Sequence, residues 1–245
     1  MTKALVLAAG LGSRIRNIAG DLPKPLMPFG DASILAHNLK WLAAAGIKDA
    51  WINLHYGADL IRNQIGDGSA FGLEIRYIYE PELLGTAGAL KNIARAVTEP
   101  MLVVYGDNVV RFDLERLFLA HARSGAEATV AVFDRTLHLN TGIAGGRVQV
   151  ASNGAITRFV EGPEAAKLSN LVNAGVYKVD PSILDLIAPG TLVDFGRDVF
   201  PAMLDQGRKL MAHVMDETGV CLGLDTPESH AAGQALLAQG KLVLA

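Results

Sequence analysis

The sequence predicts an α/β protein with a mixed, mainly parallel central sheet flanked by helices. The chain opens on an apolar run at residues 4–8, with the length and composition of a strand buried on both faces. Strand-like and helix-like segments then alternate as far as residue 79, an order typical of parallel strands joined by helical crossovers. Half of the 245 residues are apolar and 19% are charged, so a substantial core can form.

The elements of the first half follow from local patterns. Residues 33–46 place apolar side chains on one helical face, and Gly46 is a typical C-terminal stop. Residues 73–79 alternate in polarity, as a half-buried strand does. Further expected elements are strands at 50–54 and 101–105 and helices at 58–65, 85–97 and 113–124.

The second half has a less regular pattern. Residues 141–159 contain several glycines between short apolar segments, which favours hairpins over a helical crossover. Asp180-Pro181 indicates the start of a short helix, with the aspartate as its cap. The other expected elements are strands at 128–133, 172–177, 209–214 and 220–224, and helices within 192–206 and at 226–237.

Composition excludes several classes of protein. A net charge of −3 argues against a general nucleic-acid surface, and a single cysteine, Cys221, rules out an internal disulfide framework. No apolar segment approaches ~18 residues, and the first residues lack the pattern of a signal peptide. We therefore expect no nucleic-acid or membrane partner, and a cytoplasmic location.

A glycine-bearing turn follows the first strand at residues 10–14, and a polar loop leads on to Lys24. Glycines there let backbone N–H groups approach an anion closely. Arg14 and Lys24 add two cations, neither of which has an acidic neighbour four residues away. These features indicate a cradle for a polyphosphate. The stretch has no GxxxxGK[ST], and Ile15 breaks the GxGxxG fingerprint, which disfavours a nicotinamide oxidoreductase.

The same stretch resembles the signature of the sugar nucleotidyltransferases, LAAGxGxR followed after eight residues by PKPLxP. The resemblance implies a Rossmann-like fold with a small β-rich sugar-binding subdomain, within one domain spanning 1–245. Residues 1–125 would mainly bind nucleotide and 126–245 mainly sugar phosphate. It also implies that Arg14 and Lys24 are catalytic and bind the triphosphate. The first loop would contact the nucleotide through Leu7, Ala8, Ala9, Gly10, Gly12 and Ser13.

Two further segments match the family. The segment LGTAGAL is similar to the one that contacts the nucleobase, implying contacts from Gly85, Thr86 and Ala87; the alternative is a helix start capped by Thr86. Asp107 follows a buried strand and matches the family's metal aspartate, the alternative being a turn cap. The residues beside it, Gly106 and Asn108, are also expected to contact substrate.

The second metal aspartate shows a departure from the family pattern. Where many members have aspartate three residues before a threonine, this chain has Gly223. Asp225 instead directly precedes Thr226, as in cytidylyltransferases that activate acidic sugars. We assign Asp225 as the second ligand for Mg²⁺ beside Asp107; the alternative is a plain helix cap.

The resemblance implies that the sugar phosphate is bound by Gly142, through its backbone, and by the polar side chains of Glu161 and Asn173. A second departure lies beside Glu161, because Gly162 stands where the family has a lysine that binds the phosphate of the sugar 1-phosphate. The charge would then come from Lys167, Lys178 or Arg158, or the acceptor differs from an ordinary hexose 1-phosphate.

The resemblance implies an enzyme that makes an NDP-sugar and pyrophosphate from an NTP and a sugar 1-phosphate. Such nucleotide sugars serve cell-envelope polysaccharide synthesis. GTAGAL favours GTP, while UTP, CTP and dTTP stay open. The alternative to an enzyme is a catalytically silent regulatory module that binds sugar nucleotides. The protein is expected to be a monomer or homodimer.

Overall fold

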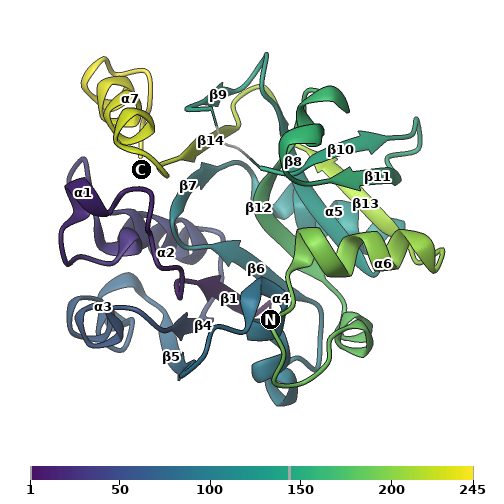
Figure 1. Ribbon diagram of the computed structural model, residues 1–245, viewed down its shortest axis with the longest axis horizontal. Helices are drawn as coiled ribbons and strands as arrows, with labels where there is room; N and C mark the ends of the chain where they lie inside the picture. The colour runs from purple at the N-terminus through teal and green to yellow at the C-terminus, as the bar shows by residue number, and fades with distance from the viewer. Residues whose placement is uncertain (1, 143–144, 245) are drawn as a thin grey trace.

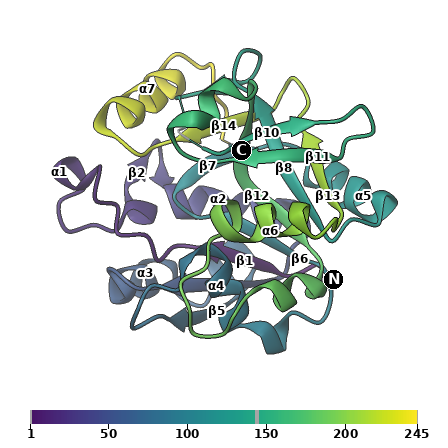
Figure 2. The same ribbon diagram turned by 45° about the vertical axis from the view of Figure 1, so that its right-hand side comes forward.

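The computed structural model describes residues 2–142 and 145–244, and its centre is a nine-stranded sheet (Figures 1 and 2). Along the sheet the order is β11 (Ile156–Val160), β10 (Arg147–Val150), β12 (Leu171–Val179), β6 (Met101–Tyr105), β1 (Ala4–Leu7), β4 (Asp49–Leu54) and β5 (Glu74–Tyr79). β8 (Ala128–Asp134) pairs with β12 and with β13 (Leu210–Val214).

The four strands that the first half contributes to this sheet, β1, β4, β5 and β6, are parallel. β1 lies between β4 and β6, with Leu7 in register with both Asn53 and Tyr105, and β4 pairs with β5. β12 then runs antiparallel to β6, with Val176 opposite Val104. Because of this reversal, the beginning of β12 lies at the same edge as the carboxyl ends of β1, β4 and β6.

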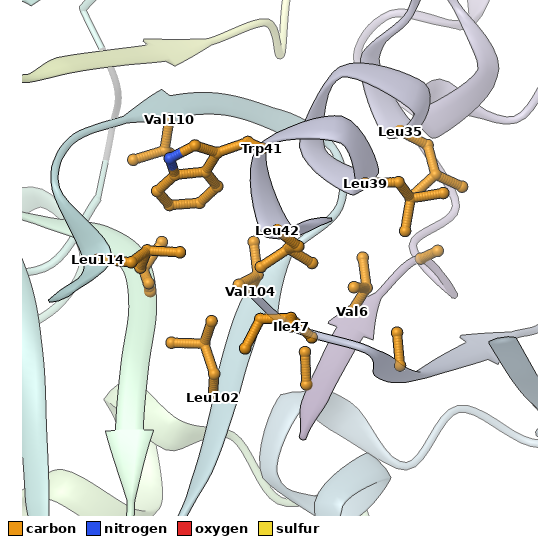
Figure 3. Close-up of a cluster of buried hydrophobic side chains, with 14 of the residues drawn as sticks. Val6, Leu35, Leu39, Trp41, Leu42, Ile47, Leu102, Val104, Val110 and Leu114 are labelled. Atoms are coloured by element: carbon orange, nitrogen blue, oxygen red, sulfur yellow. The ribbon is translucent and has the colours of Figure 1, made fainter. Parts of the chain in front are cut away.

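Helices cover both faces of the sheet. Figure 3 shows one face, where α2 (Ile34–Ala44) packs Leu39 and Leu42 onto Val6 of β1 and Val104 of β6. α3 (Ala58–Ile65) and α5 (Leu114–Ser124) cover the same face, whereas α4 (Gly85–Asn92) and α6 (Phe200–Asp205) cover the other. Successive residues of β1 alternate between the two cores, as expected of a strand buried on both sides.

A second, smaller sheet joins distant parts of the chain. It has the order β7 (Asn108–Arg111), β14 (Val220–Gly223), β9 (Leu139–Asn140), and the chain continues from β14 into α7 (Pro227–Ala238). α7 lies beside the segment that contains the hairpin of β2 (Pro28–Phe29) and β3 (Ala32–Ser33), as Figure 2 shows. A third core packs α7 against the opening loop and α1 (Arg16–Ala19).

The predicted fold class, a mixed α/β protein with a mainly parallel central sheet and flanking helices, is confirmed. The helix expected over 85–97 ends earlier, at Asn92, and continues as a 3-10 turn at Ala94–Ala96, because Ile93 and Val97 are both drawn into the core. β7 was not predicted. Among the helices that the structure describes, none is long and apolar enough to cross a lipid bilayer.

Candidate functional site

Two clefts open at the edge of the sheet where β1, β4 and β6 end. The first has a volume of about 260 Å³ and is lined by the end of β1 and the start of α4. The second, of about 280 Å³, is lined by Glu161, Asn173, Arg14 and Asp225 among others. The two clefts share four wall residues: Thr86, Tyr105, Asp107 and Asp194. They therefore form one continuous groove with two compartments.

A cluster of four charged side chains stands where the compartments meet. Lys24 Nζ lies 2.9 Å from Asp107 Oδ2 and 2.6 Å from Asp225 Oδ1, and Arg14 Nη2 lies 3.3 Å from the same Asp225 oxygen. Burial by itself would lower the pKa of Lys24, but the two carboxylates outweigh it and hold that pKa above its ordinary value. Lys24 is thus a buried cation, 4% exposed.

Both cations have acidic partners, although neither has an acidic neighbour four residues away in the sequence. Asp107 and Asp225 are 83 and 201 residues from Lys24 in sequence, so a search four residues on either side could not find them. The ammonium group stands between two carboxylates that would otherwise repel each other.

Local structure explains how the cluster is positioned. Lys24 begins a 3-10 turn at Lys24–Leu26, and Gly12 (φ +57°) passes so close that a Cβ there would lie 3.2 Å from Lys24 Cβ. Gly106 donates its N–H to Leu7 O at 2.8 Å, and a Cβ on it would lie 2.9 Å from that oxygen. Glycine at both positions therefore permits close packing around the site.

Asp225 is free of a capping role. Thr226 caps α7 instead: its hydroxyl accepts from Ser229 N, and the Ser229 hydroxyl accepts from Thr226 N. The alternative of Asp225 as a plain helix cap is therefore wrong.

The carboxylates of Asp107 and Asp225 fit a divalent cation. One oxygen of each lies within hydrogen-bonding distance of the same Nζ atom, so both face one point in space. Within residues 2–142 and 145–244, no group of three or more acidic, histidine or cysteine side chains could hold a metal alone. Two carboxylates suit Mg²⁺, which completes its shell with water and substrate phosphate oxygens. The Mg²⁺ assignment stays a prediction.

The N-terminus of α4 is anchored to the segment before α6. Thr86 Oγ1 donates to Asp194 Oδ2 and accepts from Phe195 N, both at 2.9 Å, so the alternative of Thr86 as a helix cap is wrong. The N–H groups of Ala87 and Gly88 both donate to Val193 O, at 2.9 and 3.1 Å. These amides are therefore already hydrogen-bonded, whereas the first N–H groups of a helix are often open to a ligand.

Gly85 and Thr86 line the first cleft, whereas Ala87 is completely buried. Gly85 has a positive φ of +74°, and a Cβ on it would lie 2.5 Å from Val193 O. The glycine thus permits both the turn into α4 and its contact with the 191–194 segment.

A buried polar network braces the strand ends beneath the first cleft. Ala8 N donates to Asn53 Oδ1 at 2.8 Å, and Asn53 Nδ2 donates to Glu80 Oε1 at 2.9 Å. Glu80 Oε2 accepts from Leu84 N at 3.2 Å. Sequence reasoning missed Asn53 and Glu80, although both are polar residues at or just beyond the ends of predicted strands.

The second cleft contains polar groups suited to a hydroxylated ligand. Burial and the nearby Asp194 raise the pKa of Glu161, while Arg197 Nε lies 3.5 Å from Glu161 Oε2. Asn173 donates to Tyr177 Oη at 2.7 Å and accepts from Gly175 N at 2.9 Å. Asn108 Oδ1 is buried without a hydrogen-bond partner.

The other predicted contact residues do not all line the two clefts. Leu7, Ala8, Ala9 and Gly10 line the first cleft. Gly142 lines a separate groove of about 350 Å³, shared with Arg14 and Asp225. Six of the predicted contact residues are not among the described residues that line either cleft: Gly12, Ser13, Lys24, Ala87, Gly106 and Gly142. Asp194 and Arg197 were missed; an aspartate ahead of a helix-like run is the signal that could have found the first.

The chain is similar to known proteins over most of its length. Residues 3–220 match the family described as nucleotidyl transferase. The catalytic subunit beta of mannose-1-phosphate guanylyltransferase from Drosophila melanogaster is 32% identical over 240 residues, covering 96% of this chain and 62% of that protein. UTP–glucose-1-phosphate uridylyltransferase from Synechocystis sp. is 32% identical over 234 residues, covering 90% of this chain and 60% of the relative.

Solved structures share the fold. HddC from Yersinia pseudotuberculosis superposes with a TM-score of 0.80 at 21% identity, covering 97% of this chain and all of that one. A putative glucose-1-phosphate thymidylyltransferase from Bacillus anthracis gives 0.83 at 23% identity, covering 96% and 95%. The chain spans about three fifths of the length of the two curated relatives named above. From the family match and these relatives, the chain belongs to the nucleotidyl transferase family.

Proposed function

We propose that the protein transfers a nucleoside monophosphate from an NTP to the phosphate of a sugar 1-phosphate, releasing pyrophosphate. The observation that best supports this is the Lys24–Asp107–Asp225–Arg14 cluster at the junction of two compartments. One compartment is lined by the glycine loop and the GTAG segment, and the other by Glu161 and Asn173. The proposed reaction joins a phosphate of the nucleotide to the phosphate of the acceptor. The two substrates must therefore meet, as they would at the junction of the two compartments.

The proposed chemistry is placement and charge cancellation. The acceptor phosphate is itself the nucleophile, so no protein nucleophile is needed. The rate acceleration would come from in-line alignment of the substrates and from stabilisation of charge at the α-phosphorus. Lys24 would bind the α-phosphate and Arg14 the departing β- and γ-phosphates. Asp107 and Asp225 would hold Mg²⁺, which when bound neutralises charge on the phosphate oxygens.

GTP is the favoured nucleotide. Support comes from the position of the GTAG segment at the first cleft and from relatives named as guanylyltransferases, among them one from Mycobacterium tuberculosis at 31% identity. UTP is the second candidate, because the Synechocystis relative is named as a uridylyltransferase. The silent binding module is disfavoured, since Arg14, Lys24 and both carboxylates are retained and converge.

A melting-temperature panel of four NTPs, with mannose 1-phosphate and glucose 1-phosphate as acceptors and Mg²⁺ present, identifies the nucleotide, because a ligand that binds only the folded state raises its stability. Pyrophosphate release is then measured for each pair. We expect release that depends on both substrates and on Mg²⁺. Binding of nucleotide sugars without any release would instead support the silent module.

A further inference from the structure

A cavity of about 730 Å³ lies at the edge of the central sheet opposite to the two clefts. Its wall includes Thr2 and Pro100, which precede β1 and β6, and Lys178, near the end of β12. Because β1 and β6 lead to the glycine loop and to Asp107 at their other ends, this cavity is separate from the catalytic groove. It has more than twice the volume of either cleft, which is room enough for a small molecule.

Lys178 has no task in the proposed reaction. None of the three cations named for the acceptor charge, Lys167, Lys178 and Arg158, is among the described residues that line the second cleft. Lys178 belongs to the wall of the opposite cavity instead, where only 5% of its surface is exposed. The surroundings of that cavity therefore decide what its amine can do.

The ammonium group of Lys178 is held by neutral partners. Nζ donates to Pro100 O at 2.6 Å and to Thr2 Oγ1 at 3.1 Å, and it lies 5.0 Å from the centre of the Phe118 ring. No carboxylate is among these described contacts. Burial lowers the pKa of Lys178 to about 8, although the charge of Glu99 acts in the opposite direction. The neutral amine, which is the nucleophilic form of lysine, is therefore well populated near pH 8.

The other titratable groups in the wall have their own partners. His121 Nδ1 lies 2.9 Å from Thr129 Oγ1, and burial lowers the pKa of this histidine. Glu127 accepts a hydrogen bond from Arg208 Nε at 2.8 Å, and Asp180 caps the 3-10 turn that follows it. The amine of Lys178 is therefore the group of this wall best placed to act as a nucleophile.

We propose that Lys178 is an acylation site, modified by small acyl phosphates that enter through this cavity. The neutral amine attacks the carbonyl carbon, and an N–C bond forms as the C–O bond to the phosphate breaks. The bonding electron pair leaves with the phosphate, which also takes up the proton that the nitrogen releases. The products are an amide on Lys178 and hydrogen phosphate, so no further reactant is needed.

The amide product fits these surroundings. Its N–H still donates to Pro100 O, and the Thr2 hydroxyl can turn to donate to the new carbonyl oxygen. An uncharged amide also avoids the cost of keeping an ammonium group away from water. An acetyl group is small beside about 730 Å³, and its methyl group can pack against Phe118.

Acetylation of the intact chain by acetyl phosphate tests this assignment. Each lysine is followed by peptide mass spectrometry from about pH 7 to 10. Lys167 is the comparison, because its side chain is 76% exposed and forms an ion pair with Glu164 on the surface. At pH 8 roughly half of the Lys178 amine is neutral, against roughly 0.4% for an ordinary lysine.

We expect Lys178 to be acetylated ~10-fold faster than Lys167 at pH 8, because its narrower access and weaker basicity offset part of the gain in neutral amine. The rate at Lys178 should level off above about pH 9, whereas the rate at Lys167 should keep rising. If Lys178 reacts no faster than Lys167, or if the two pH profiles are parallel, Lys178 is not an acylation site of this kind.

Two controls connect the rate to the cavity. Ala122→Leu adds bulk at an exposed residue of the cavity wall, so it should slow acetylation of Lys178 several-fold and leave Lys167 unchanged. In the chain unfolded by urea, Lys178 should lose its advantage over Lys167. An equal rate in Ala122→Leu and the wild type, or an advantage that persists in urea, would overturn the proposal. The reaction uses neither nucleotide nor sugar phosphate, so its outcome is independent of the proposed function.

Discussion

Replacing Lys24 with methionine tests the centre of the site. The substitution keeps the volume of the buried stem and removes the ammonium group between Asp107 and Asp225. Removing one partner of a buried ion pair costs ~3–5 kcal/mol, because it leaves uncompensated charge. Here the two carboxylates are 32% and 23% exposed, so water compensates part of the loss. We expect a loss of about 2–3 kcal/mol in the free energy of unfolding.

For a chain of this length, that loss corresponds to a fall in melting temperature of roughly 4–12 °C. Turnover should fall ~10²-fold or more, the scale of losing one charge-stabilising group. Mg²⁺ alone should raise the melting temperature of Lys24→Met more than that of the wild type, because the divalent cation no longer competes with the ammonium group for the same two oxygens.

The measurements are urea denaturation and thermal unfolding with and without Mg²⁺. Lys167→Met is the matched control: its exposed pair with Glu164 should contribute no more than ~0.5 kcal/mol. If Lys24→Met unfolds at the same urea concentration as this control, and Mg²⁺ stabilises it no more than the wild type, the ammonium group does not hold the carboxylates together.

Three further predictions follow from single residues. Arg14→Ala should lower turnover ~10²-fold while urea denaturation shows an intact fold, and near-normal turnover would remove Arg14 from the mechanism. Gly85→Ala should destabilise the fold by about 2–4 kcal/mol, from its positive φ and its overlap with Val193 O. Gly240→Ala shares the positive φ but has open space, so it should cost only ~1 kcal/mol, and equal losses would contradict the overlap. Finally, burial and Asp194 raise the pKa of Glu161 above 4.5, so the folded state binds more protons between 4.5 and that raised value. Wild-type stability should therefore decline with pH across this range relative to Glu161→Gln, and parallel curves from urea denaturation would argue against the shift.

Local pattern was sufficient for much of the architecture. The buried strands, their alternation with helices and the placement of the glycine loop at the carboxyl edge all depend on short-range signals. The pairing of β7 with β14 does not depend on short-range signals, because the two strands lie more than 100 residues apart and each is only four residues long. This pairing is what brings Asp225 beside Lys24.

For the candidate site too, the sequence identified individual residues but not their tertiary contacts. The resemblance to the family located Arg14, Lys24 and Asp107, yet it could not show that both cations are paired, since pairing depends on tertiary contacts. Asp194 was missed for a related reason: its contacts with Thr86 and with the N–H groups of the 195–197 turn become visible only when α4 packs against that segment.

The bond between Lys24 and Asp225 joins positions 201 residues apart. During synthesis on the ribosome, the opening loop emerges long before its partner, so the first nine tenths of the chain lack Asp225 and cannot form this contact. Closing a loop of this span has an entropic cost, and contacts between distant residues slow folding, so we expect this contact to form late in folding. Ending the chain between β13 and Asp225 would remove this partner of Lys24 while keeping every strand of the central sheet.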